Sequence, residues 1–137
     1  MSGSGQSADE QPVPAGPPDA DFRLTRSRRL TPAQFKEVFA VDRSFPGRYV
    51  VMWLRLGPAS ARRMGAVASR RAFHTAVGRN RARRLMREAF RLNRASLRSD
   101  ADVILVARAR LAQVRAPAVA IDFCALCRRA GIWEGRN

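Results

Sequence analysis

Residue types that commonly build catalytic and metal sites are scarce in this chain of 137 residues. Histidine occurs once, at His74, with no cysteine or carboxylate cluster near it in the sequence. The two cysteines, Cys124 and Cys127, stand in the stretch CALC without a second pair, which makes half of a zinc site at most. The simplest interpretation places both as small apolar residues on neighbouring turns of a helix, with a redox role as the alternative. We expect no metal or cofactor bound by the protein itself.

Long apolar runs are missing as well. No run approaches the roughly 18–20 residues that span a bilayer, and the N-terminus has no basic segment followed by an apolar one. Apolar residues still make up 46% of the chain, which is enough for a modest core. The sequence therefore predicts a soluble intracellular protein with one folded domain and no membrane association.

Acidic residues are few and unevenly placed. The chain has 26 Lys+Arg against 11 Asp+Glu, a net charge of +15. Residues 1–21 contain four acids and no base, so residues 22–137 carry all 26 bases and only seven acids, a net +19. The four acids are Asp9, Glu10, Asp19 and Asp21. Every base except Lys36 is arginine, which can hold phosphate bidentately. So much like charge indicates a nucleic-acid partner, ahead of an anionic membrane surface.

The seven acids of residues 22–137 do not cluster in the way that a metal-dependent nuclease requires. Only Asp100 and Asp102 are close in sequence, and they flank the start of a predicted strand, where a role in a turn is sufficient. We therefore predict no catalytic residue in the protein itself.

The chain divides into a tail and a domain. Residues 1–21 are rich in glycine, serine and proline, and we predict an acidic, disordered tail. Residues 22–137 are predicted to form a single α+β domain, with helices covering one face of a small sheet and the other face partly free. The predicted helices are 32–41, 76–98 and 116–131, and the predicted strands are 48–56, 63–69 and 102–108.

The first helix has the clearest start signals. Thr31 stands at the N-cap, Pro32 at the first helical position, and Gln34 completes a capping box. Phe35 and Phe39 then fall on one apolar face. These rings could pack only in the core, or could also stack nucleic-acid bases on an exposed face.

The helix predicted for residues 76–98 has two contrasting stripes. Its apolar stripe comprises Ala82, Leu85, Met86, Ala89, Phe90 and Leu97, and its basic stripe Arg83, Arg84, Arg87, Arg91, Arg94 and Arg98. A solvated face usually mixes charges, because like pairs one turn apart repel, yet Glu88 is the only acid between Arg79 and Arg98. The stripe therefore favours a polyphosphate partner. At Gly78–Arg81, free backbone N–H groups could bind phosphate, and Asn80 could cap the helix or contact a base or sugar.

These residues carry a resemblance to a known family. The run ASRRAFHTAVGRNRARRLMREAFR, residues 68–91, resembles the signature of the bacterial ribonuclease P protein component, in which a strand end with two basic residues leads to an Arg-Asn-Arg motif opening a basic helix. RLTPAQFKEVF resembles the first helix of that family and DVILVAR its last strand, so that the resemblance covers about residues 22–131.

The resemblance implies both a fold and a function. The fold is a four-stranded, mainly antiparallel sheet with three helices and a left-handed strand–helix–strand crossover, a ribosomal protein S5 domain 2-like fold. The function is that of the cytoplasmic protein subunit of ribonuclease P, with one protein on each catalytic RNA. The RNA subunit, with Mg²⁺, removes the 5′ leader of precursor tRNA, and the protein promotes that step by binding both RNAs.

The resemblance also implies two binding sites. The RNA subunit would be held by Arg79, Asn80, Arg81, Arg83, Arg84, Arg87 and Arg91. The single-stranded leader would enter a cleft between the first helix and the sheet, lined by Phe35, Phe39, Arg70 and Arg71. An aromatic residue of the family's strand near this cleft aligns with Met52, with Trp53 adjacent. The alternative is that the chain is a ribosomal or assembly protein that binds structured RNA. Such a protein has no reason to combine these motifs in this order.

Overall fold

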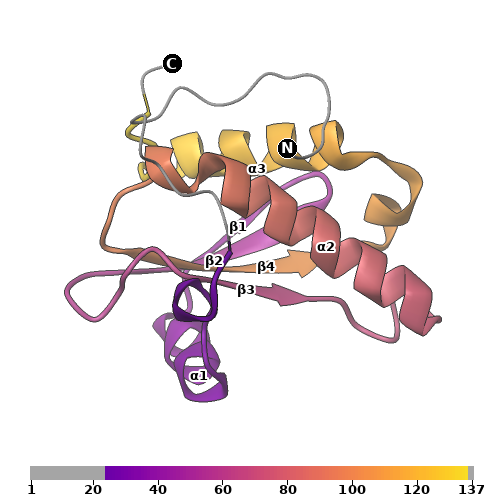
Figure 1. The fold of residues 1–137 in the computed structure, drawn as a ribbon, viewed down its shortest axis with the longest axis horizontal. Helices are drawn as coiled ribbons and strands as arrows, with labels where there is room; N and C mark the ends of the chain where they lie inside the picture. Colours follow the sequence, from indigo (N-terminus) through magenta and orange to yellow (C-terminus); the bar gives the residue numbers. More distant parts are fainter. Residues whose placement is uncertain (1–23, 136–137) are drawn as a thin grey trace.

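The computed structural model describes residues 24–135, which form a small sheet packed against three longer helices (Figure 1). The predicted tail, residues 1–21, lies outside the described residues. Within residues 24–135, none of the helices is both long and apolar enough to cross a membrane.

The helices and strands follow the predicted order with one addition. The helices are α1 (Pro32–Val41), α2 (Ala76–Asn93) and α3 (Ala116–Arg129), and the strands are β1 (Ser44–Pro46), β2 (Val50–Leu56), β3 (Met64–Val67) and β4 (Ala101–Ala107). Short 3-10 turns lie at Arg26–Arg28, Arg94–Ser96 and Ala109–Gln113. The strand missed by the sequence patterns is β1, which has only three residues and contains Pro46. Proline is tolerated there because β1 is an edge strand.

The four strands form one mixed sheet in the order β1-β2-β4-β3. β2 pairs antiparallel with both β1 and β4, whereas β3 pairs parallel with β4. Helix α2 connects the two parallel strands, giving the strand–helix–strand unit that a parallel pair requires. The fold class inferred from the resemblance, a four-stranded, mainly antiparallel sheet with three helices, is confirmed.

Helices cover both faces of the sheet, so the prediction that they share one face was wrong. α2 and α3 lie on one face and α1 on the other (Figure 1). The main core, between the sheet and α2 and α3, contains Met52, Phe90 and Phe123. A second, smaller cluster beneath α1 contains Leu30, Val38 and Ile104. The sequence could not show this, because an apolar helix face does not say which side of a sheet it covers.

The helix ends follow the local signals. Thr31 forms the predicted capping box, in which its hydroxyl accepts from the Gln34 N–H and its own N–H donates to the Gln34 side chain. Gly131 follows the C-cap of α3, and its φ of 78° is in the left-handed region. The N–H groups of Gly131 and Ile132 bond back to the carbonyls of Arg128 and Cys127, the pattern of a glycine-terminated helix.

A carboxylate of α3 holds the turn between β1 and β2. Asp122 accepts hydrogen bonds from the backbone N–H groups of Arg48, Tyr49 and Val50 at 2.9, 2.8 and 3.2 Å. A Cβ on Gly47 would lie 2.7 Å from the Asp122 carboxylate, so the turn passes this helix at a distance that only glycine allows. Asp122 therefore ties the edge of the sheet to α3.

Removing this carboxylate should destabilise the fold. We expect Asp122→Ala to lower the free energy of unfolding by about 2–4 kcal/mol, because partly buried N–H groups lose their acceptor. Urea denaturation measures the change. Ile121→Ala, one residue earlier on α3, is the control, because its side chain is 71% exposed. Equal stability of the two variants would contradict the role of Asp122.

Candidate nucleic-acid interface

Helix α2 begins one turn before the Arg-Asn-Arg motif. Thr75 is its N-cap: the Gly78 N–H donates to the Thr75 hydroxyl at 3.0 Å, and the Arg79 N–H donates to the Thr75 carbonyl at 3.1 Å. The expectation of free backbone N–H groups at Gly78–Arg81 was therefore wrong, as was a capping role for Asn80. The Asn80 side chain instead accepts a hydrogen bond from Arg83 at 3.1 Å.

The apolar stripe of α2 is buried as predicted. Ala82, Leu85, Met86, Ala89 and Phe90 are at most 7% exposed, and Leu97, just beyond the helix, is 2% exposed. Burial of this stripe against the sheet fixes the rotation of α2, so that its arginines face away from the core.

The first arginines of the motif are held by backbone carbonyls. Arg79 donates to the Phe73 carbonyl at 3.0 Å, which ties α2 to the preceding loop. Arg81 donates to the carbonyls of Ala112 and Val114, which ties α2 to the turn before α3. Both guanidinium groups are half-buried. These two residues therefore shape the start of α2, in addition to any contact that they make with RNA.

The last arginines of the basic stripe are also engaged. Arg91 forms an ion pair with Glu88, and Arg98 forms one with Asp100 at 2.9 Å. Arg94 donates to the Arg62 carbonyl at 2.9 Å. At this end of the stripe, carboxylates and a carbonyl already satisfy the guanidinium groups.

The middle of α2 is different. Arg83, Arg84 and Arg87 form no ion pair with any carboxylate of residues 24–135, and the same holds for Arg29. Arg29 flanks β3, where its backbone bridges to Met64. Burial, together with the nearby charges of Arg29 and Arg83, lowers the pKa of the Arg87 guanidinium. We refer to Arg29, Arg83, Arg84 and Arg87 as the arginine surface.

Holding these cations together costs free energy in the absence of an anion, because like charges repel and a partly buried guanidinium loses hydration. The packing of α2 does not require these arginines to lie together, since the buried stripe is on the opposite side of the helix. A run of phosphates offers both the charge and the bidentate geometry that guanidinium groups prefer. Arg29 was not among the candidate residues predicted from the sequence, although the basic run RSRRL was an available signal.

A set of aromatic rings lies on the other side of the sheet, beneath α1. Phe39 packs edge-on against Trp53, with ring centroids 5.2 Å apart, and lies 6.4 Å from Phe35. The Phe35 ring covers Gly65 of β3 so closely that a Cβ there would clash with its Cζ. Phe39 is 36% exposed, so its ring combines core packing with an accessible edge. We refer to Phe35, Phe39 and Trp53 as the aromatic face.

The structure distinguishes Met52 from Trp53. Met52 is fully buried in the main core, opposite Leu105. Trp53 faces α1, opposite Ile104 in the register. The aromatic side chain of β2 on the α1 side is therefore Trp53. Arg70 and Arg71 are exposed in the turn after β3, between the sheet and the start of α2.

Most carboxylates of the domain have internal partners. Asp102 is fully buried and accepts from Arg55 at 2.9 Å, from Arg63 at 2.7 Å, and from the N–H groups of Ala61 and Arg63. Burial opposes its ionisation, but these hydrogen bonds outweigh that cost and hold the pKa of the Asp102 carboxyl below its usual range. Asp102 therefore does more than the role in a turn that was expected for it: it is the centre of a buried ionic network.

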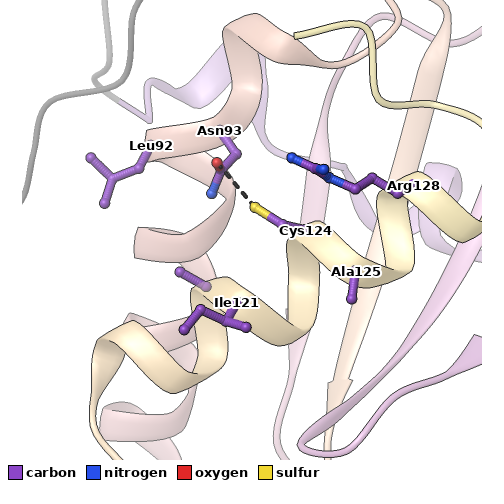
Figure 2. A pocket seen from close by; sticks show the side chains of 7 residues that line it. Leu92, Asn93, Ile121, Cys124, Ala125 and Arg128 are labelled. Atoms are coloured by element: carbon purple, nitrogen blue, oxygen red, sulfur yellow. Dashed lines mark hydrogen bonds between the residues drawn. The ribbon is translucent and has the colours of Figure 1, made fainter. Parts of the chain in front are cut away.

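Cys124 lines an apolar groove between α2 and α3 (Figure 2). The Cys124 thiol donates to the Asn93 side chain at 3.3 Å, and Cys127 is buried in the core. Burial raises the pKa of both thiols, so neither is an activated nucleophile. Both are free thiols one helical turn apart, which agrees with the simpler of the two interpretations.

Comparison with known proteins shows the family of this chain. A family model described as Ribonuclease P matches residues 24–131. The chain belongs to the ribonuclease P protein family. The Ribonuclease P protein component of Azotobacter vinelandii is 38% identical over 103 residues, which cover 74% of this chain and 78% of that protein. The corresponding protein of Pseudomonas putida is 37% identical over 103 residues, which cover 74% and 76%.

Solved structures of ribonuclease P proteins share the fold. The protein from Thermotoga maritima is 26% identical, with a TM-score of 0.64 over 74% of this chain and 96% of that chain. A Staphylococcus aureus protein is 20% identical, with a TM-score of 0.67 over 77% and 97%, and supports the fold alone. The matched region contains both the arginine surface and the aromatic face, so each belongs to the ribonuclease P domain itself.

Proposed function

We propose that this chain is the protein subunit of ribonuclease P and that its arginine surface binds the RNA subunit. The observation that carries the proposal is the group of Arg29, Arg83 and Arg87, whose charges lie close together with no carboxylate partner within residues 24–135. Phosphates of a folded RNA would neutralise this surface, and counterion release would add to the affinity.

The carboxylates support a role for the protein in positioning RNA rather than in catalysis. Glu37, Glu88, Asp100, Asp102 and Asp122 are all committed to internal contacts. The protein would therefore position RNA, while the RNA subunit with its Mg²⁺ cleaves precursor tRNA to give the mature 5′ end. One protein would serve each catalytic RNA, in the cytoplasm.

Within the RNA-subunit site, the predicted residues would differ in role. Arg83, Arg84 and Arg87 would contact phosphate directly. Arg79 and Arg81 would act mainly by fixing the loop and the turn that flank α2, because carbonyls already hold them. Asn80 would orient Arg83, and Arg91 would contribute less because Glu88 offsets its charge.

The leader of precursor tRNA would bind at the aromatic face. Stacking of bases on Phe39 and Trp53 is tolerant of sequence, since every base has a π-face. Arg70 and Arg71 lie at the end of β3, where they could contact leader phosphates that pass from the aromatic face toward α2. Both binding sites would then lie on one continuous path across β3.

The leader proposal predicts a substrate-dependent effect. We expect Phe39→Ala to weaken holoenzyme binding to leader-bearing precursor tRNA by about 1–3 kcal/mol, the contribution of one stacked base. Binding to mature tRNA, which has no leader, should be unchanged. Affinities of the two RNAs for the reconstituted holoenzyme measure this difference.

Ile121→Ala is the matched control, because it removes an exposed apolar side chain from the opposite side of the sheet. An equal loss of affinity for both RNAs would show that Phe39 supports the fold or the RNA subunit, and would remove the leader role.

A further inference from the structure

The charges of the arginine surface have no carboxylate partner within residues 24–135, and residues 1–21 of the same chain carry the opposite charge. Arg29, Arg83 and Arg87 raise each other's free energy through like-charge repulsion, and no carboxylate of residues 24–135 pairs with them. Residues 1–21 carry Asp9, Glu10, Asp19 and Asp21 with no base. The two segments are complementary in charge.

The acidic segment is attached to the domain a few residues before Arg29. Leu24, the first described residue, packs against the main core, so the chain enters the domain at a fixed point. Asp21 precedes Arg29 by eight positions, a span that reaches about 28 Å at most. Attachment at this range gives an effective concentration on the order of millimolar, which allows weak ionic contacts to be populated.

We propose that the acidic segment, residues 1–21, docks on the arginine surface in the RNA-free protein and competes with RNA for it. This inference rests on the proposed RNA-binding function. A few carboxylates cannot match the phosphate density of a folded RNA, so the RNA subunit displaces the segment. A short or unstructured RNA makes fewer contacts and competes poorly. The segment therefore raises selectivity for the RNA subunit over other RNAs.

The test neutralises the segment in the full chain with Asp9→Asn, Glu10→Gln, Asp19→Asn and Asp21→Asn. The matched control changes four neutral residues of the same segment, with Ser4→Ala, Gln6→Ala, Ser7→Ala and Gln11→Ala. The first readout needs no RNA: NMR signals of the arginine Nε–H groups in the free protein. We expect the signals of Arg83 and Arg87 to shift in the neutralised protein and to stay in place in the control.

The second readout is affinity for a single-stranded oligouridine. We expect the neutralised protein to bind it about tenfold more tightly than the control at about 0.05 M salt, and equally at about 0.5 M, where charges are screened. Unmoved arginine signals, or shifts confined to arginines outside the arginine surface, would overturn the docking. Arginine shifts in a protein that binds no RNA at α2 would preserve the docking and refute the proposed function, so that the two failures are distinguishable.

Discussion

Replacing Arg83, Arg84 and Arg87 with glutamine should weaken binding to ribonuclease P RNA by about 3–4 kcal/mol at about 0.1 M salt, on the order of 10²–10³-fold. Each substitution would remove one charge-assisted phosphate contact. The slope of log affinity against log salt should therefore fall in magnitude by about one unit per contact. Filter binding over a series of salt concentrations measures both quantities.

The fold should survive these substitutions. Arg84 is exposed, and Arg87 carries an electrostatic cost in the free protein, so its loss relieves repulsion. The control is Arg43→Gln, Arg48→Gln and Arg110→Gln, which removes the same net charge from exposed positions outside α2. If both triple variants lost affinity equally, overall charge would explain binding and the arginine surface would have no special role.

Replacing Asp102 with asparagine should lower the free energy of unfolding by about 3–5 kcal/mol, because Arg63 would be left partly buried with no countercharge and Arg55 would keep only the exposed carboxylate of Glu37. The side chains of Arg55 and Arg63 are only 12% and 15% exposed, and Asp102 is fully buried between them. The loss of its charge is therefore poorly screened by water. Urea denaturation provides the measurement, with circular dichroism as the signal.

Asp100→Asn is the control, because its ion pair with Arg98 is 37% exposed on both sides, so that water screens it and its contribution to stability should be small. A comparable destabilisation by both substitutions would contradict the special role of the buried network.

The same network predicts the response to acid. The pKa of Asp102 is lower in the folded protein than in the unfolded chain, so its contribution to stability is complete above the unfolded value of about 3.9. That contribution decreases as the pH falls through the folded pKa. Asp102→Asn should therefore flatten the dependence of stability on pH below about 4.

The sequence predicted what local patterns determine. Thr31, Pro32 and Gln34 specify the start of α1 within a few residues, and the helical period of α2 separates its buried stripe from its arginines. The apolar run of β2 was recognisable as a strand. The sequence could not show which face of the sheet Met52 and Trp53 each occupy. Both faces are covered, so apolar residues do not alternate with polar ones along the strand.

The sequence indicated most arginines of the candidate site, but not which of them other groups of the protein already neutralise. Which arginines are already neutralised depends on contacts distant in sequence, such as Arg81 with the Val114 carbonyl. Arg29 joins the surface only because the segment before α1 runs along β3. The buried network of Asp102 likewise brings Arg55 and Arg63 together across two loops, which no spacing rule indicates.

The proposed role of this protein is to bind RNA so that a catalytic RNA can process precursor tRNA. The most direct test adds the protein to a bacterial ribonuclease P RNA at low Mg²⁺ and follows removal of the 5′ leader. We expect cleavage at the mature 5′ end that depends on the protein, is absent with protein alone, and is lost when Arg83, Arg84 and Arg87 are replaced. No stimulation of a cognate RNA would contradict this role and leave a general structured-RNA-binding protein.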